Sequence, residues 1–203
     1  MSTGVMILAA GAATRMGKAK MLLPYQSVNI LQHIVNEIQQ IQPQSVLIVT
    51  GCYHQLIMEQ MKEQQAVKLV YNEKWPTGMA SSIQAGVQWI LQQPIPVSQL
   101  FLLVSDQPYL NAQLLQDMLQ LQQQTKKGMI AATYEGIAGT PVLFSQAYFI
   151  ELLKLQGDKG ARSLLKQYRE DVATISFPMG KFDIDTPEDY QQFCLQNQTN
   201  NAN

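Results

Sequence analysis

Cysteine is scarce in this sequence, and its scarcity excludes a disulfide framework. Only Cys52 and Cys194 occur among 203 residues, and they form no CxxC pair. This usage is typical of a reducing compartment, so we expect a cytoplasmic protein. The two histidines, His33 and His54, have no matching cysteine spacing, so a zinc site is not expected.

Long apolar runs and an excess of positive charge are also lacking. No segment approaches the roughly 20 apolar residues of a membrane-spanning helix. Residues 1–4 do not begin the basic and then apolar stretch of a signal peptide. The formal net charge is −1, so the sequence does not indicate the broad basic surface that nucleic-acid binding needs. We therefore expect neither a membrane nor a nucleic acid as partner, and any phosphate must meet a few placed cations or a metal ion.

What the sequence does contain is an alternation of short apolar runs with stretches of helical spacing. Such an alternation predicts an α/β fold with a mainly parallel sheet covered on both faces. With no internal repeat and no long linker, one domain is expected over residues 1–195, followed by a disordered polar tail at 196–203. Strands are predicted at 5–9, 45–50, 67–71, 100–104, 129–133 and 172–177, and helices at 28–41, 53–64, 80–92, 111–124, 146–154, 160–168 and 187–196.

The unusual loops of this sequence all follow predicted strands. They comprise residues 9–24, 72–80 and 105–110. In open α/β sheets, ligands bind in the crevice at the carboxyl ends of the strands. We therefore expect these three loops to form the functional site.

The first loop combines small residues with cations. Leu8-Ala9-Ala10-Gly11 allows backbone N–H groups to approach a phosphate closely, and Arg15 and Lys20 add positive charge. The loop is not a P-loop, because its glycine spacing is one residue too long and Ala19 stands where Ser or Thr would hold magnesium. A phosphate-binding loop is favoured over a purely structural turn.

Carboxylates follow the strands at two further places. Asp106 comes directly after the predicted strand 100–104, where it suits a hard metal ion on triphosphate oxygens. A turn-forming Asp before Pro108 is the alternative. Asp183 and Asp185 alternate on an extended stretch and so point to one face. One or both could complete a metal site with Asp106.

The residues of two segments could serve helix capping as well as function. Thr186 is predicted to cap the last helix, with Glu188 and Asp189 in its first turn. In the loop 72–82, Ser81 and Ser82 at a helix start suit either a nucleotide or a simple cap.

The motifs together resemble a known group of enzymes. The pattern Leu-Ala-Ala-Gly-x-x-x-Arg-Met-Gly-x-x-Lys-x-Leu-Leu-Pro at 8–24 closely resembles the signature of nucleotidyltransferases related to those that complete molybdenum cofactors. The resemblance extends over about residues 4–193. Further matching blocks are Asn72, Gly78-Met79-Ala80-Ser81-Ser82-Ile83, Asp106-Gln107-Pro108, Gly139-Thr140-Pro141-Val142-Leu143-Phe144, Gly157-Asp158-Lys159-Gly160-Ala161-Arg162 and Asp183-Ile184-Asp185-Thr186-Pro187-Glu188-Asp189-Tyr190.

Within this group the sequence is most similar to molybdenum cofactor cytidylyltransferases. It has Ala9-Ala10-Gly11 where the corresponding guanylyltransferases usually have Ala-Gly-Gly, and it has the Gly-Asp-x-Gly-Ala-Arg block. It departs from its relatives at Thr140, where they often carry His. The resemblance implies a Rossmann-like three-layer α/β/α sandwich, CTP with Mg²⁺ and a molybdopterin-type phosphate acceptor. It also implies pyrophosphate as the leaving group.

The resemblance also implies roles for individual residues. We predict that Asp106 and Asp185, with Asp183 as the alternative, bind the metal, and that Arg15, Lys20 and Asp106 are catalytic. For Asp158 and Arg162, a helix-capping pair is the structural alternative. The predicted nucleotide-binding residues are Leu8, Ala9, Ala10, Gly11, Arg15, Lys20, Gly78, Ser81 and Ser82, and the predicted acceptor-binding residues are Asn72, Asp158 and Arg162.

The expected reaction transfers CMP from CTP to the phosphate of molybdopterin. The alternatives are a guanylyltransferase that uses GTP, a sugar- or alditol-phosphate nucleotidyltransferase, and a non-catalytic partner that delivers the cofactor to a molybdoenzyme client. The set Arg15, Lys20, Asp106 and Asp185 favours turnover, because binding alone needs no metal at the α-phosphate.

Overall fold

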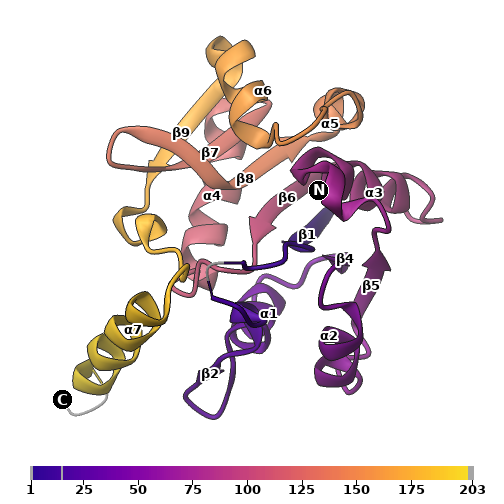
Figure 1. Cartoon of the computed structure of the whole chain (residues 1–203). Coiled ribbons are helices and arrows are strands. Elements are labelled where there is room, and N and C mark those ends of the chain that lie inside the picture. The colour runs from indigo at the N-terminus through magenta and orange to yellow at the C-terminus, as the bar shows by residue number, and fades with distance from the viewer. Residues whose placement is uncertain (1, 15, 201–203) are drawn as a thin grey trace.

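The structure is a computed structural model that describes residues 2–14 and 16–200, without the side chains of 197–200. In the described chain, seven strands form the main sheet in the order β5-β4-β1-β6-β8-β7-β9 (Figure 1). Every neighbouring pair is parallel except those that β8 makes with β6 and β7. The mainly parallel sheet is therefore confirmed. The strands are β1 (Thr3–Ala9), β4 (Ser45–Thr50), β5 (Val67–Tyr71), β6 (Gln99–Val104), β7 (Met129–Tyr134), β8 (Ile137–Ser145) and β9 (Val172–Ser176).

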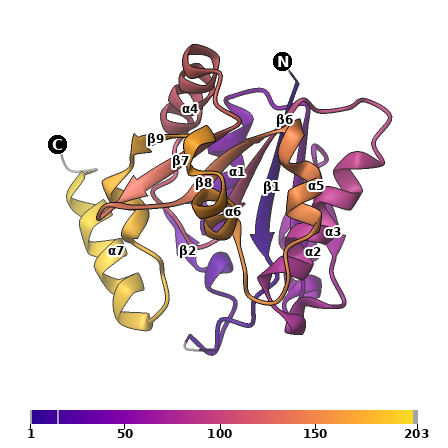
Figure 2. The ribbon, with the colours of Figure 1, turned by 90° about the horizontal axis from the view of Figure 1, so that it is seen from above.

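Helices cover both faces of this sheet, as Figures 1 and 2 show. Because side chains alternate along a strand, β1 serves two cores. Val5 and Ile7 pack with the apolar side chains of α1, α2 and α4, and Met6 and Leu8 pack with those of α3, α5 and α6. The three-layer α/β/α sandwich is confirmed. The helices are α1 (Ile30–Gln39), α2 (His54–Met61), α3 (Met79–Leu91), α4 (Ala112–Thr125), α5 (Phe149–Leu153), α6 (Ala161–Gln167) and α7 (Pro187–Asn200).

The strand β8 was not predicted, although it is the longest strand of the described sheet. Gly139 and Pro141 lie inside it, and both residues are unfavourable in a strand interior. A shift in the β7–β8 register accommodates them, since Ala131 pairs with Val142 and Ala132 pairs with Gly139. Residues 140 and 141 therefore bulge out of the ladder, which is why the sequence pattern alone conceals this strand.

The predicted helix 28–41 was wrong at its start. A hairpin of β2 (Pro24–Tyr25) and β3 (Val28–Asn29) precedes α1, which begins at Ile30. Asn29 forms a reciprocal capping box, because its side chain accepts from the Gln32 N–H while the Gln32 side chain accepts from the Asn29 N–H. At the other end of the chain, α7 extends beyond the predicted 187–196 to Asn200.

Parallel pairing places the predicted functional loops at one edge of the sheet. The strands β1, β4, β5 and β6 all end there, and backbone hydrogen bonds join the segments that follow them. Ser105 N–H donates to Leu8 C=O at 3.2 Å, Cys52 N–H to Ala10 C=O at 3.1 Å, and Ile184 N–H to Asp106 C=O at 3.2 Å. No helix in the described chain has both the length and the apolarity to cross a membrane.

The close packing of α3 on β1 generates a stability prediction. A Cβ at Gly86 of α3 would overlap the fully buried Met6 Sδ and lie 3.0 Å from Val49 Cγ2. Overpacking of this kind costs about 1–3 kcal/mol, which exceeds the gain of up to about 1 kcal/mol in helix propensity from Gly to Ala. We therefore expect Gly86→Ala to lower the free energy of unfolding measured with urea.

The matched control is Met6→Ala, which removes the opposing side chain. The Gly86→Ala change should cost less in the Met6→Ala background than in the wild-type protein. Equal costs in both backgrounds would show that the two side chains do not compete for the same space.

Candidate active site

A cavity of about 460 Å³ lies at the carboxyl edge of the sheet. The loop after β1, the end of β6 and the start of α3 form its walls. It has the size and position expected of a small-molecule site in this class of fold. Its lining includes the predicted residues Leu8, Ala9, Ala10, Gly11, Lys20, Gly78, Ser82, Asp106, Asp158 and Asp185.

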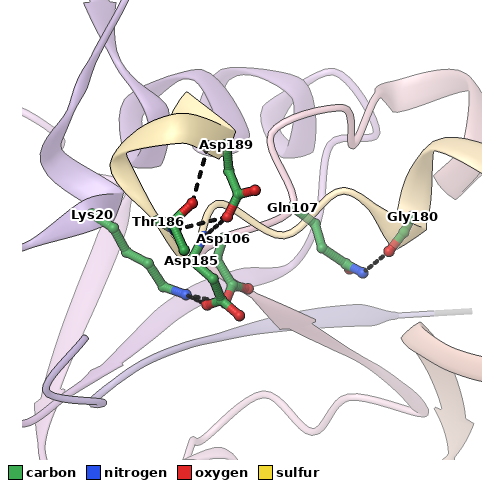
Figure 3. A network of polar contacts seen from close by, with 7 residues as sticks. All are labelled: Lys20, Asp106, Gln107, Gly180, Asp185, Thr186 and Asp189. Carbon is green, nitrogen blue, oxygen red and sulfur yellow. Dashed lines mark hydrogen bonds and ion pairs between the residues drawn. The ribbon is translucent and has the colours of Figure 1, made fainter. Parts of the chain in front are cut away.

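Lys20 joins two carboxylates in this cavity. Its Nζ lies 2.7 Å from Asp106 Oδ2 and 2.7 Å from Asp185 Oδ1, with 12% of the lysine side chain exposed (Figure 3). Burial lowers the pKa of Lys20, but the attraction of Asp106 and Asp185 outweighs burial and raises it above its usual value. Lys20 is therefore a fixed positive charge at neutral pH.

The local fold brings Asp185 to Asp106 from a distant part of the sequence. The Ile184 N–H bonds to the Asp106 carbonyl, so the segment 183–185 lies along the end of β6. Asp189 Oδ2 accepts from the Asp185 and Thr186 N–H groups at 3.1 and 2.8 Å, and Thr186 Oγ1 accepts from the Asp189 N–H at 3.1 Å (Figure 3). The predicted cap of the last helix is confirmed, and this cap also positions Asp185.

A further contact fixes the turn after Asp106. The buried amide of Gln107 donates to the Gly180 carbonyl at 2.7 Å, which joins this turn to the segment that leads into Asp183 (Figure 3). Sequence reasoning assigned Gln107 no role. This hydrogen bond joins the turn that carries Asp106 to the segment that leads to Asp183 and Asp185.

Asp183 adds negative charge to the same place. Partial burial, together with repulsion from Asp106 and Asp185, raises the pKa of Asp183 to about 6, although Lys20 and Arg162 oppose the shift. Three carboxyl groups therefore influence one another here, and a cation lowers the free energy of such an arrangement.

The donor set fits a hard divalent cation. The oxygens of Asp106 and Asp185 converge on one charge, and carboxylate oxygens are the ligands that Mg²⁺ prefers. Among the described residues, no group of three or more His, Cys, Asp or Glu side chains is arranged to hold a metal. Two carboxylates suffice for Mg²⁺ at substrate phosphates, because this ion usually keeps water and phosphate oxygens as its other ligands.

The loop after β1 lines the same cavity as these charges. The carbonyls of Ala10 and Ala12 are bonded to the Cys52 N–H and the Tyr53 hydroxyl, at 3.1 and 2.7 Å. Within residues 2–14 and 16–200, the N–H groups of residues 11–14 donate to no backbone carbonyl. Such a run of amides suits an anion. Arg15, predicted to be catalytic and to bind nucleotide, lies outside the described residues.

The loop before α3 uses most of its polar groups internally. The Ser81 hydroxyl donates to Lys74 and Gly78 carbonyls, both at 2.9 Å, and Ser81 does not line the cavity. The Ala80 N–H donates to the Gly157 carbonyl at 3.0 Å. Ser82 does line the cavity, so it is the better placed of the two predicted serines.

The three predicted acceptor residues lie in different surroundings. Asn72 is buried, and its amide donates to Ser81 and Ser82 at 2.8 and 3.0 Å, so the structure places it behind the cavity wall. Asp158 lines the cavity. The exposed Arg162 is not part of the cavity lining, and its Nη2 donates to the Tyr134 hydroxyl at 3.3 Å. Acceptor binding by these residues stays a prediction.

Comparison with known proteins adds to this geometry. Residues 5–172 match the family described as the MobA-like NTP transferase domain. This chain belongs to that family. Together with the cleft, this places the protein among the nucleotidyltransferase enzymes.

Relatives of this MobA-like protein include two of similar length. It is 26% identical to the molybdenum cofactor cytidylyltransferase of Escherichia coli K12 over 184 residues, which cover 91% of each chain. It is also 26% identical to the purine catabolism protein PucB of Bacillus subtilis 168 over 194 residues, which cover 90% of this chain and 91% of PucB.

Solved structures share the whole fold. The Rv0371c protein of Mycobacterium tuberculosis H37Rv superposes with a TM-score of 0.81 and 25% identity, covering 94% of this chain and 96% of that one. A complex of that protein with manganese superposes with a TM-score of 0.76 and 23% identity, over 95% of this chain and 97% of the other.

The charge cluster of this MobA-like site generates a prediction on pH dependence. The pKa of Asp183 rises from 3.8 to about 6 on folding. Between these values the folded protein keeps a proton that the unfolded chain has lost, so this group makes stability fall as pH rises from about 4 to about 6. Asp183→Asn should remove the loss of stability that Asp183 causes between about pH 4 and about pH 6. The measurement is the urea midpoint of unfolding at each pH, without added metal.

The matched control for this measurement is Glu59→Gln, a change of an exposed carboxylate on α2. Although neighbouring groups crowd Asp183, the residue stays exposed to solvent, so water screens its interactions and its effect on stability is expected to be small. If the wild type and Asp183→Asn lost stability in parallel from pH 4 to pH 6, the interaction of Asp183 with Asp106 and Asp185 would be wrong.

Proposed function

We propose that this protein transfers CMP from CTP to the terminal phosphate of a molybdopterin-type cofactor and releases pyrophosphate, with Mg²⁺ bound at Asp106 and Asp185. The single observation that carries the proposal is Lys20, held 2.7 Å from both Asp106 and Asp185 beside a run of backbone amides. This constellation suits a triphosphate, whose charge must be neutralised and whose reacting atoms must be positioned.

The reaction needs no covalent enzyme intermediate. An oxygen of the acceptor phosphate attacks the α-phosphorus of CTP in line, and the bond from that phosphorus to the oxygen bridging the α- and β-phosphates breaks. The electron pair leaves with pyrophosphate. When bound, Mg²⁺ would supply charge neutralisation at the triphosphate oxygens.

The residues of the chain supply positioning and further charge. Lys20, which remains protonated, neutralises the charge that grows on the leaving pyrophosphate. Arg15 has the same predicted role. The amides of residues 11–14 hold phosphate oxygens, Gly78 and Ser82 line the nucleotide side, and Asp158 and Arg162 are proposed to face the acceptor.

The choice of CTP and of a pterin acceptor is supported by sequence. Ala9-Ala10-Gly11 resembles the cytidylyltransferases of this group, and the similarity to the Escherichia coli molybdenum cofactor cytidylyltransferase covers most of both chains. A manganese complex is known for a structural neighbour, which agrees with a divalent metal. A client molybdoenzyme would then receive the finished cofactor.

The first test is thermal stability with ATP, CTP, GTP and UTP, each with and without Mg²⁺. A ligand at 100 times its Kd adds about 2.7 kcal/mol, or about 5–10 °C in Tm for a chain of this size. We expect a magnesium-dependent shift that is largest with CTP. A shift led by GTP would indicate a guanylyltransferase, and one led by UTP or ATP would indicate a sugar-phosphate acceptor.

Asp106→Ala should reduce pyrophosphate release from CTP and the pterin acceptor by at least about 100-fold, because it removes a proposed metal ligand. Glu188→Gln, an exposed carboxylate in the first turn of α7, should leave turnover within about twofold of the wild type. Circular dichroism checks that both variants fold.

Retention of activity in a folded Asp106→Ala protein would contradict the assignment. A wild-type protein that binds CTP and the cofactor but never releases pyrophosphate would favour the non-catalytic delivery partner instead.

A further inference from the structure

Trp75 is the one aromatic side chain among the described residues that line the cavity. It lies in a short 3₁₀ helix, Trp75–Thr77, between β5 and α3, and it is half-buried. A partly exposed indole in a polar, charged cleft leaves apolar surface in contact with water. Aromatic faces of this kind are binding surfaces for flat ligands.

The position of the indole depends on Gly51, which directly follows β4. A Cβ at Gly51 would lie 2.6 Å from Trp75 Cγ, 2.7 Å from Trp75 Cβ and 2.6 Å from the Ala10 carbonyl oxygen. Only a residue without a side chain lets the indole pack this closely over the end of β4. The ring is therefore held against the loop that carries the phosphate-binding amides.

The segment that carries Trp75 is fixed at both ends. The Trp75 N–H donates to the Asn72 carbonyl at 3.2 Å, and the Asn72 N–H donates to Thr50 at the end of β4 at 2.9 Å. The buried Asn72 side chain joins the segment to α3 through Ser81 and Ser82. The indole is thus pre-organised, which lowers the entropic cost of binding a ligand on it.

The distance from the charged end of the cavity matches a nucleotide. Gly51 follows β4, and Asp106 follows β6, two strands away in the order β4-β1-β6. At about 4.8 Å between strands, the indole over Gly51 lies about 10 Å from the carboxylates along the edge. A nucleotide whose phosphates lie at Asp106 and Lys20 would extend its base toward Trp75.

We propose that Trp75 is the platform on which the nucleobase of the substrate stacks. This inference rests on the nucleotide site of the proposed function, but it does not depend on the identity of the acceptor. Stacking recognises the flat face that every base has, so Trp75 contributes affinity for nucleotides in general. Base preference must come from other groups.

The chain allows a direct spectroscopic test, because it contains only Trp75 and Trp89. Trp89 packs against the core under α3, ten residues or about 15 Å along the helix from its start at the cavity. In Trp89→Phe, tryptophan emission reports Trp75 alone. CTP with Mg²⁺ should quench the Trp75 emission over the same range of CTP concentration that raises the Tm. Tripolyphosphate with Mg²⁺ should leave the emission unchanged.

A binding series with Trp75→Leu and Trp75→Phe separates stacking from loop structure. Trp75→Leu should bind CTP about 5- to 100-fold more weakly, while tripolyphosphate binding stays within about twofold. Trp75→Phe keeps an aromatic face and should recover most of the affinity for CTP.

Three outcomes would overturn the proposal. If CTP stabilises Trp89→Phe without changing its emission and binds Trp75→Leu as tightly as the wild type, stacking is wrong and the proposed function stands. If Trp75→Leu also binds tripolyphosphate more weakly, Trp75 maintains the structure of the loop and does not stack on the base. If no nucleotide binds the wild type with any divalent metal, both proposals fail.

Discussion

The shared ion pair of Lys20 with Asp106 and Asp185 is the interaction on which the rest of the site depends. It joins residues that are 86 and 165 positions apart in sequence, at 2.7 Å each. A third carboxyl group, that of Asp183, lies close enough to this pair that burial, together with repulsion from Asp106 and Asp185, raises its pKa to about 6. Such a concentration of negative charge is weak evidence for a purely stabilising role. This arrangement is what the proposed ligand, a metal ion together with a polyphosphate, would require.

The fold around this cluster follows from strand order. Placing β1 between β4 and β6 brings the amide-rich loop, the indole of Trp75 and the carboxylate of Asp106 to one edge in a line. The backbone bond from Ile184 to Asp106 then adds the late segment that carries Asp185. Membership of the MobA-like NTP transferase family agrees with this arrangement, since nucleotide and acceptor need adjoining places at one edge.

Much of this architecture could be predicted from the sequence, and what could not has physical causes. The buried runs of β1, β4 and β6 and the helix spacings gave the layered fold, and the residue types after the strands gave Lys20, Asp106 and Asp185. The strand β8 was not predicted, because Gly139 and Pro141 interrupt the residue pattern of a strand. Trp75 could not be assigned from the sequence, because its place depends on its packing against Gly51. Asn72 was predicted to bind the acceptor, and its burial against Ser81 and Ser82 is a tertiary contact that the sequence pattern does not reveal.

We propose above that a divalent metal on a nucleoside triphosphate binds between Asp106 and Asp185. This proposal is tested most directly by a crystal structure with Mn²⁺ and a non-hydrolysable CTP analogue, in which anomalous scattering locates the metal. We expect one anomalous peak in contact with both carboxylates and with triphosphate oxygens, and we expect Lys20 to have moved onto the phosphates. A metal bound elsewhere, or a triphosphate that does not reach Lys20, would contradict it.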